Sequence, residues 1–293
     1  MKLGKPSART RGDSPLKRTL IHLVLIIACI IAVYPVSRVV SISLRPGDRP
    51  LSSDLSIIPK NATLKNYQLV LFGDPVTKRA SDFFLWLWNS LLITLTTATI
   101  GLILASTAAY AFSRFKFPGR APGLIFLLTT QMIPAGMLLL PLFRMLANLK
   151  LLNTYLGLII AYSVTSVPFS IWILKGYYDT IPIDLEEAAR IDGTSHVGAF
   201  YRIILPLSTP SLAIAFLFNF MSSWSEYLVA RVILQKAPMY TWPLGMWTFA
   251  GQFNTAYGRF AAASVMVAVP ATILFLWSSK WLVSGLTLGG VKG

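Results

Sequence analysis

Residues 186–206 read EEAARIDGTSHVGAFYRIILP, and this polar stretch decides the fold because long apolar runs flank it on both sides. Asp184, just before it, is predicted to cap a short helix, with Glu187 in the reciprocal capping position. That helix covers residues 185–192, and Gly193 ends it because glycine enters the left-handed conformation at little cost. The stretch is therefore expected to begin with a structured helix and turn rather than a flexible tether.

A second short helix is expected directly after this turn. Thr194 or Ser195 supplies its cap, and Pro206 closes it. Ala188 and Ala189 in the first helix are small enough to let a partner surface approach the backbone closely. Charged side chains surround them: Glu186, Glu187, Asp192, Arg190 and Arg202. On these features alone, an ordinary capped connection and a docking element for a second protein both remain open.

The rest of the chain has the composition of a membrane protein. Of its 293 residues, 55% are hydrophobic and 13% are charged, and the mean hydropathy is +0.63. A soluble domain would carry roughly a quarter charged residues. The 26 Lys and Arg against 11 Asp and Glu lie mostly between apolar runs, which argues against a nucleic-acid-binding surface. Cys29 is the only cysteine in the sequence, which excludes an intrachain disulfide.

Six apolar stretches are long enough to cross a bilayer, which takes about 20 residues each. They cover residues 20–37, 83–113, 121–143, 151–174, 207–234 and 260–279. Prolines interrupt several of them, which predicts kinked helices packed in a bundle. The first stretch is too long for a cleaved signal peptide, and no small-x-small site follows it cleanly. We expect an all-α polytopic membrane protein with six transmembrane helices.

The spacing of these stretches predicts the organisation of the chain. It consists of a basic tail (1–19), a first transmembrane helix (20–44), an extracytoplasmic loop (45–82), a transmembrane domain (83–283) with a cytoplasmic loop at 177–206, and a C-terminal tail (284–293). The connection after the second stretch carries Arg114, Lys116 and Arg120 without an acid, and the N-terminal tail is basic as well. The positive-inside rule therefore places both termini and the 186–206 stretch in the cytoplasm.

One spaced pattern within the polar stretch is long enough to be specific. It consists of Glu187-Ala188-Ala189, then Gly193 after three residues, then Ile203-x-Leu205-Pro206 after nine more. This pattern resembles, at every fixed position, the EAA loop of ABC importer permeases. Five other stretches resemble the carbohydrate-importer branch, and together the smaller permease of maltose/maltodextrin-type importers: SISLR (41–45), LWNSL (87–91), AAYAFSRFKFPG (108–119), FAAASVMVAVP (260–270) and WLVSGLTLGGVKG (281–293).

The resemblance implies a type I ABC importer permease fold in the plasma (inner) membrane of a bacterium or archaeon. It implies three kinds of protein partner besides the bilayer: a second, larger permease, two ATP-binding subunits and an extracytoplasmic sugar-binding protein. In that family the EAA loop docks in a cleft of the ATPase, which implies coupling roles for Glu186, Glu187, Ala188, Ala189, Asp192, Gly193, Leu205 and Pro206. The tail residues Gly289, Gly290 and Lys292 are expected to contact the ATPase, although a free glycine-rich tail fits the sequence too.

The chain is expected to be a transport subunit and not an enzyme. It has no G-x-x-x-x-G-K-[ST] phosphate loop, so ATP and Mg are expected to be used by partner subunits, with no cofactor bound by this chain. His22 and His196 are far apart in sequence and no cysteine cluster exists, so no metal site is expected.

Two groups of residues are candidates for contact with sugar or its binding protein. Asn219, Trp224, Glu226 and Tyr227 are a candidate translocation pathway, because ionisable groups at membrane depth usually face an interior or aqueous path. Glu226 in interfacial water and Trp224 in ordinary packing fit as well. In the maltose-type family the loop that holds Tyr240, Trp242 and Trp247 reaches into the binding protein, while an aromatic interfacial belt is the alternative.

The solute implied by the resemblance is a maltose/maltodextrin-like oligosaccharide, moved by alternating access. Trehalose or another oligosaccharide is the first alternative, and an amino acid or polyamine is another within the family. An ion-coupled secondary transporter would show inverted repeats and paired intramembrane carboxylates, which are not evident. A polytopic membrane enzyme would need clustered catalytic residues, and the sequence has none near one interface.

Overall fold

The computed structural model describes residues 14–47, 56, 58–75, 80–250 and 255–289, and their regular structure is helical, without a β-strand. Four helices are long and apolar enough to cross a membrane: α1 (Pro15–Ser43), α3 (Phe83–Arg114), α6 (Tyr155–Tyr178) and α13 (Tyr257–Gly289). Two bent pairs raise the number of spans to as many as six: α4 (Arg120–Thr130) with α5 (Ala135–Asn148), and His196–Leu207 with α10 (Thr209–Trp224). This is the all-α polytopic architecture that the sequence predicts.

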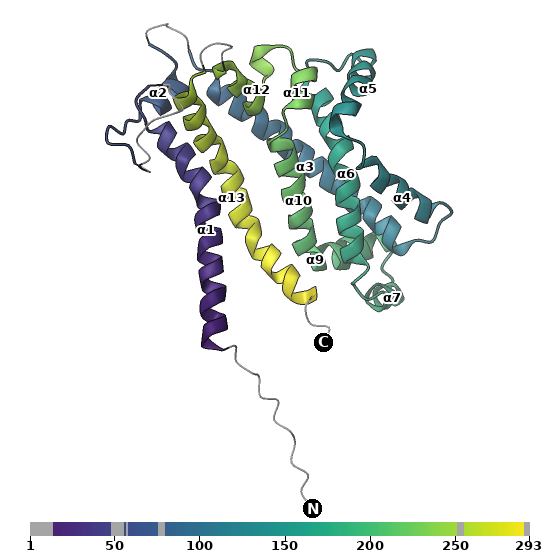
Figure 1. Cartoon of the computed structure of the whole chain (residues 1–293). Helices are drawn as coiled ribbons and strands as arrows, with labels where there is room; N and C mark the ends of the chain where they lie inside the picture. The colour runs from purple at the N-terminus through teal and green to yellow at the C-terminus, as the bar shows by residue number, and fades with distance from the viewer. Residues whose placement is uncertain (1–13, 48–55, 57, 76–79, 251–254, 290–293) are drawn as a thin grey trace, which may run out of the picture.

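Helix α3 is the central element, and it packs most extensively against α6 and α10 (Figure 1). Its buried face carries Gly101, Ala105 and Ala109 at four-residue spacing. Small residues in such a stripe let neighbouring helix backbones approach closely, which is the usual basis of helix packing in membranes. A Cβ atom at Gly101 would lie 3.2 Å from Nδ2 of Asn219 on α10. The sequence of α3 therefore fixes how closely α10 can pack against it.

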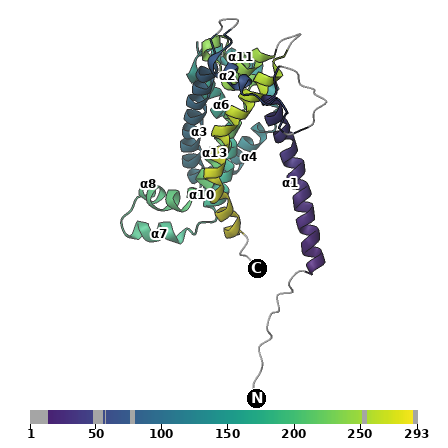
Figure 2. The ribbon, with the colours of Figure 1, turned by 90° about the vertical axis from the view of Figure 1, so that its left-hand side faces the viewer.

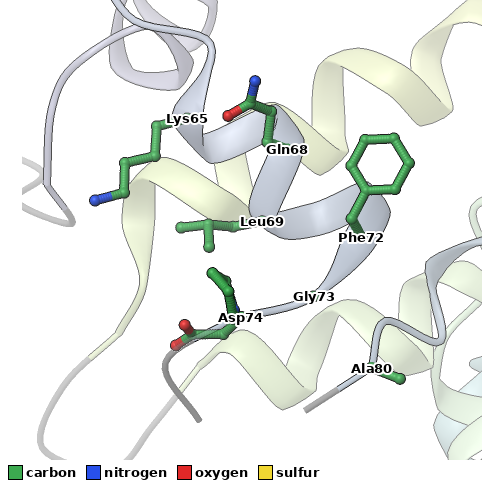
Figure 3. Close-up of a pocket in the computed structure, with 8 residues that line it drawn as sticks. Lys65, Gln68, Leu69, Phe72, Gly73, Asp74 and Ala80 are labelled. Carbon is green, nitrogen blue, oxygen red and sulfur yellow. The ribbon is translucent and has the colours of Figure 1, made fainter. Parts of the chain in front are cut away.

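Helix α1 lies at the edge of the bundle and packs against α13 (Figure 1). Its apolar side chains are largely exposed, which fits a helix surrounded by lipid. At its end it is joined to the short helix α2 (Lys65–Phe72). Nδ2 of Asn66 donates hydrogen bonds to the carbonyl oxygens of Ser43 (3.0 Å) and Arg45 (2.8 Å). Beside α2 lies a hollow of about 540 Å³ (Figure 3), lined by Lys65, Gln68, Leu69, Phe72, Gly73, Asp74, Pro75 and Ala80.

The third predicted span is broken. The sequence predicts one helix over 121–143, but α4 and α5 meet at an angle of 102°. The break lies at residues 131–134, and Pro134 precedes the first turn of α5. Proline lacks the N–H that a continuing helix needs and disfavours helical geometry at the preceding residue. The length of an apolar stretch does not show where the helix within it bends.

The fifth predicted span is also shorter than expected. Helix α10 ends at Trp224, and a separate helix, α11 (Leu228–Ile233), follows. The carboxylate of Glu226 accepts hydrogen bonds from the backbone N–H groups of Val229 (2.8 Å) and Ala230 (3.1 Å). Glu226 therefore lies in the break between α10 and α11, where its side chain caps the start of α11, and not within one continuous helix.

The two ends of the bundle differ in what they carry. Helix α1 begins and α13 ends at the end where α7 (Asp184–Ile191) lies (Figure 1). We call this the inner end, and the opposite end, which carries α2, α11 and α12 (Trp242–Met246), the outer end. Figure 2 shows that α7 and α8 (His196–Ala199) project from the side of the bundle at the inner end.

Candidate functional site

The projecting element consists of two helices joined by a tight turn, and we call residues Asp184–Leu207 the inner hairpin. Its first helix, α7, begins after Ile183, and no side chain caps it. The predicted capping by Asp184 and Glu187 is therefore wrong. Asp184, Glu186 and Glu187 instead lie within the first turn, where negative charge is stabilised by the helix dipole.

The turn of the inner hairpin follows the local chemistry of its residues. Gly193 has a φ angle of +86°, as predicted for a residue that ends a helix in the left-handed conformation. The N–H of Thr194 donates to the carbonyl oxygen of Ala189 (2.9 Å). Oγ of Ser195 accepts a hydrogen bond from the N–H of Gly198 (3.1 Å), so Ser195 is the cap of the second helix.

The second helix of the hairpin is longer than the sequence predicts. It runs over His196–Leu207, through a π-helical turn at Phe200–Ile204 and the short helix α9 (Leu205–Leu207). Pro206 does not close it, because a proline in the first turn of a helix is tolerated. The chain instead bends by 80° at Ser208, where α10 begins.

A buried glutamate attaches the inner hairpin to the bundle. The carboxylate of Glu186 forms an ion pair with Nε of Arg114, and both side chains are 7% exposed. Its second oxygen accepts a hydrogen bond from the hydroxyl of Tyr110 at 2.7 Å. Nη2 of Arg114 also donates to the carbonyl oxygen of Ile181 (3.0 Å), just before α7. Because Tyr110 and Arg114 belong to α3, these contacts fix α7 to the inner end of the central helix.

A second set of polar contacts adds α6 to this junction. Oγ of Ser113 on α3 donates to the carboxylate of Asp179 (2.7 Å), which follows α6 and also pairs with Lys175. Burial alone would raise the pKa of Asp179, but the hydrogen bonds from Lys175 and Ser113 outweigh it and hold that pKa below its ordinary value. Nη1 of Arg114 donates to Oγ of Ser113 (3.1 Å), which links the two sets. The inner ends of α3 and α6 and the start of α7 therefore form one polar cluster.

The face of the inner hairpin that carries Glu187 is exposed. Glu187, Ala188, Asp192 and Gly193 are exposed, Ala189 is half-buried, and Ile191 is 88% exposed. Further exposed apolar side chains lie nearby: Ile183, Leu185, Val197 and Tyr201. Exposed apolar residues among charges mark a protein–protein contact surface when they gather in one patch. The adjacent glutamates thus differ in environment, because Glu186 is buried against the bundle and Glu187 is exposed.

Sequence reasoning missed the residues that hold the hairpin. Tyr110, Ser113, Arg114 and Asp179 were not among the candidate residues. The only signal was that the first three fall in the AAYAFSRFKFPG stretch at the end of an apolar span. An arginine at such a place needs a counter-charge or water, but the sequence does not say which acid supplies it.

The structure does not gather the candidate pathway residues around one cavity. Asn219 is buried between helices, and its Oδ1 accepts a hydrogen bond from Oγ of Ser170 (2.7 Å). Trp224 is buried and stacks on Phe220, with ring centroids 5.3 Å apart. Glu226 caps α11, and Tyr227 packs against Trp247 near the outer end.

The aromatic residues near the outer end belong to a segment that α3 holds in place. We call residues 234–249 the outer segment. Nδ2 of Asn89 on α3 donates to the carbonyl oxygens of Pro238 (2.9 Å) and Tyr240 (3.0 Å). Oδ1 of Asn89 accepts from the hydroxyl of Tyr155 (2.8 Å), and the N–H of Trp242 donates to Oγ of Ser90 (2.7 Å).

The outer segment differs along its length in exposure. Tyr240 and Trp242 are half-buried, whereas Trp247 is 55% exposed.

Of the candidate tail residues, Gly289 is the last residue of α13, and Gly290 and Lys292 lie outside the described residues. Among the described residues, no three His, Cys, Asp or Glu side chains come together in a way that could hold a metal ion.

The family of the chain follows from the sequence over most of its length. Residues 81–287 match the family described as "Binding-protein-dependent transport system inner membrane component". The chain belongs to this family. It is therefore a permease subunit of an ABC importer, a multi-pass component of the inner membrane, and a transport component rather than an enzyme.

Named relatives of this family are similar to the chain from end to end. The maltose/maltodextrin transport system permease protein MalG of Salmonella typhimurium is 38% identical over 291 residues, covering 95% of this chain and 97% of that protein. The galactooligosaccharides transport system permease protein GanQ of Bacillus subtilis is 36% identical, covering 93% and 94%. A solved bacterial ABC transporter that imports alginate contains a chain of the same fold, with a TM-score of 0.76, 24% identity and coverage of 92% and 99%.

Proposed function

We propose that this chain is the smaller transmembrane subunit of an ATP-driven importer for a maltose/maltodextrin-like oligosaccharide. The similarity to permeases named for maltose/maltodextrin and for galactooligosaccharides supports a sugar as the transported solute. The higher identity to the maltose/maltodextrin permeases favours that solute, and galactooligosaccharides are the alternative that a specific relative supports. The assembly would comprise a second, larger permease, two ATP-binding subunits that use ATP and Mg, and an extracytoplasmic sugar-binding protein.

The orientation we propose places the inner end in the cytoplasm. Arg114, Lys116 and Arg120 lie at the inner end, in and beside the α3–α4 connection, and no acid lies in that connection. The basic N-terminal tail precedes α1, which also begins at that end. Positive charge in short connections is retained on the cytoplasmic side. Both termini and the inner hairpin would then face the ATPase subunits, and the outer segment would face the binding protein.

The inner hairpin is proposed to receive movement from the ATPase. Its exposed face offers Glu187, Ala188, Ala189, Asp192 and Gly193 to a docking cleft. Leu205 and Pro206 lie at the other end of the hairpin, where they would stiffen the passage into α10. A contact of Gly289, Gly290 and Lys292 with the ATPase remains a further proposal.

Glu186 and Arg114 are proposed to pass this movement to the transmembrane helices. A hairpin attached only by chain ends would tilt on its own when the ATPase subunits close. Because a buried ion pair joins α7 to α3, the two helices would instead move together. Alternating access requires the ATPase contacts to differ between the two states of the bundle, since a ligand shifts an equilibrium only through differential affinity. The Glu186–Arg114 contact is the observation on which this mechanism rests.

The role proposed for the sugar-pathway residues depends on a movement of the helices. Asn219, Trp224, Glu226 and Tyr227 would reach sugar only after the helices around them separate, because Asn219 and Trp224 are buried in the state described. Tyr240, Trp242 and Trp247 are proposed to meet the binding protein, with Trp247 the most exposed of the three.

The test is ATP-driven uptake by the assembled transporter in proteoliposomes. Labelled maltotriose is added with the cognate binding protein, and unlabelled maltose, trehalose and a galactooligosaccharide are added as competitors. We expect ATP-dependent accumulation that maltose suppresses most strongly. Suppression only by the galactooligosaccharide would reassign the solute, and uptake without ATP or partner subunits would contradict the proposed function.

A further inference from the structure

A hollow of about 500 Å³ lies at the inner end of the bundle, outside the inner hairpin. It is formed where the α3–α4 connection meets α4 and the end of α6, and it is lined by Phe117, Gly119, Arg120, Ala121, Pro122, Leu124 and Lys175. Two of its lining side chains are cations from different helices, Arg120 and Lys175. The candidate functional residues do not line it, so it needs a separate explanation.

The hydrogen-bonding capacity of the two cations is only partly used. Nη2 of Arg120 donates to the carbonyl oxygen of Ser113 (3.3 Å), and Lys175 pairs with Asp179. An arginine carries five N–H donors and a lysine three, so most of these donors are available to an occupant of the hollow. Asp179 pairs with Lys175 and also interacts electrostatically with Arg120, so these two cations and one acid together leave about one net positive charge at the hollow. The occupant that fits must supply acceptor oxygens and about one negative charge.

An apolar strip leads from the hollow along α4. Leu124 lines the hollow, and Ile125 and Leu128 follow on the face of Ala121, at spacings of four and seven residues. Ile125 is 62% exposed and Leu128 is 39% exposed. The strip leads away from the inner end, because α4 begins there and runs up to its junction with α5 (Figure 1). The site therefore joins a cationic hollow near the inner end to an exposed apolar path along α4.

We propose that this hollow binds the headgroup of an anionic phospholipid from the inner leaflet. The phosphate would accept hydrogen bonds from Arg120 and Lys175, and an acyl chain would lie along Ile125 and Leu128. Basic pockets between transmembrane helices are known to bind such headgroups. A soluble acidic peptide would satisfy the cations but not the apolar strip, which favours a lipid. Bound lipid would brace the α3–α4 connection against α6, next to the polar cluster that holds α7.

The experiment measures lipid retained by the purified transporter. The assembled complex is equilibrated in nanodiscs with equal amounts of phosphatidylglycerol and phosphatidylcholine, extracted in mild detergent, and its bound lipid is counted by native mass spectrometry. We expect retained phosphatidylglycerol to exceed phosphatidylcholine at least fivefold. Arg120→Gln and Lys175→Gln should each reduce that excess severalfold, and Arg144→Gln should leave it unchanged. Arg144 is a matched control because it is an exposed cation on α5, toward the outer end.

A second variant keeps both cations, so that an effect on lipid binding can be separated from an effect of charge removal on assembly. Ala121→Trp fills the hollow from an exposed position and should abolish the excess of phosphatidylglycerol in an intact complex. Equal retention of the two lipids by the native complex would overturn the proposal, as would an undiminished excess in both Arg120→Gln and Ala121→Trp. Loss of an ATP-binding subunit from Arg120→Gln without any change in lipid would also overturn it, and would assign the hollow to a protein partner.

Discussion

Glu186 on α7 and Arg114 on α3 form an ion pair that is almost closed to solvent, between residues 72 positions apart in the chain. Two desolvated charges are stable together only when each also satisfies its remaining hydrogen-bonding groups. The hydroxyl of Tyr110 donates a hydrogen bond to Glu186, and Arg114 donates one to the carbonyl oxygen of Ile181. The neighbouring Glu187 is exposed, so only the first of the two glutamates attaches α7 to the bundle.

Removing the cation of this pair should destabilise the junction of α3 and α7. Arg114→Met leaves the carboxylate of Glu186 buried without its counter-charge, which costs about 3–5 kcal/mol. We expect a lower thermal unfolding temperature of the detergent-solubilised chain and faster hydrogen exchange in residues 181–191. Lys116→Met removes an exposed cation two residues away and should change neither measurement. Equal unfolding temperatures for the two variants would refute a structural role of the pair.

Reversing the charge of Glu187 should act on assembly and not on folding. Glu187→Lys alters an exposed side chain, so its effect on stability should be limited to about 1 kcal/mol, from the lost interaction with the dipole of α7. Because this residue lies on the proposed docking face, co-purification of the ATP-binding subunit should fall at least tenfold and uptake should cease. Arg144→Glu, an exposed charge reversal on α5, serves as the control. Normal ATPase recovery with Glu187→Lys would place the docking face elsewhere.

The turn of the hairpin should tolerate no side chain without strain. Gly193 has a φ of +86° and open space around the position of a Cβ atom, so the cost of Gly193→Ala comes from the backbone alone, at about 1–2 kcal/mol. Gly193→Pro cannot adopt this φ at all and should abolish uptake while the chain stays in the membrane. Gly136→Ala, in a helix and also with open space, is the control and should lower neither stability nor uptake. Full uptake by Gly193→Pro would show that the hairpin geometry is irrelevant.

The outer segment should loosen when its anchor on α3 is removed. Asn89→Leu deletes the bonds to Pro238, Tyr240 and Tyr155, each worth about 0.5–1.5 kcal/mol. Hydrogen exchange should therefore quicken across residues 234–249, while exchange at the inner hairpin stays unchanged. Thr107→Val is a suitable control on the same helix, since among the described residues its hydroxyl bonds to carbonyl oxygens of α3 itself. Unaltered exchange in the outer segment would mean that other contacts hold it.

The sequence predicts best what depends on neighbouring residues. The turn at Gly193 and the cap at Ser195 are local, and both are present. The bend at Pro134 and the early end of α10 were missed, because apolar composition measures how long a stretch is and not whether its helix is continuous. The long apolar helices follow directly from the number of residues that a bilayer requires.

The contacts at the site could not be predicted, because they depend on the packing of α3. Three acids share the first turn of α7, and only the three-dimensional arrangement selects Glu186 to face Arg114. Asn89 lies in a stretch that resembles the family, but its partners are carbonyl oxygens some 150 positions away, at separations of 149 and 151. Backbone acceptors have no sequence signature, so such an anchor is visible only in the folded chain.

The most direct test of the mechanism is the amount of sugar imported per ATP hydrolysed by the assembled transporter in proteoliposomes, with Arg114→Met compared against the native chain and Lys116→Met. If the Glu186–Arg114 pair joins the inner hairpin to α3, Arg114→Met should keep its ATP-binding subunits and hydrolyse ATP, yet import at least tenfold less sugar per ATP. An unchanged ratio in Arg114→Met, with the complex intact, would contradict the account.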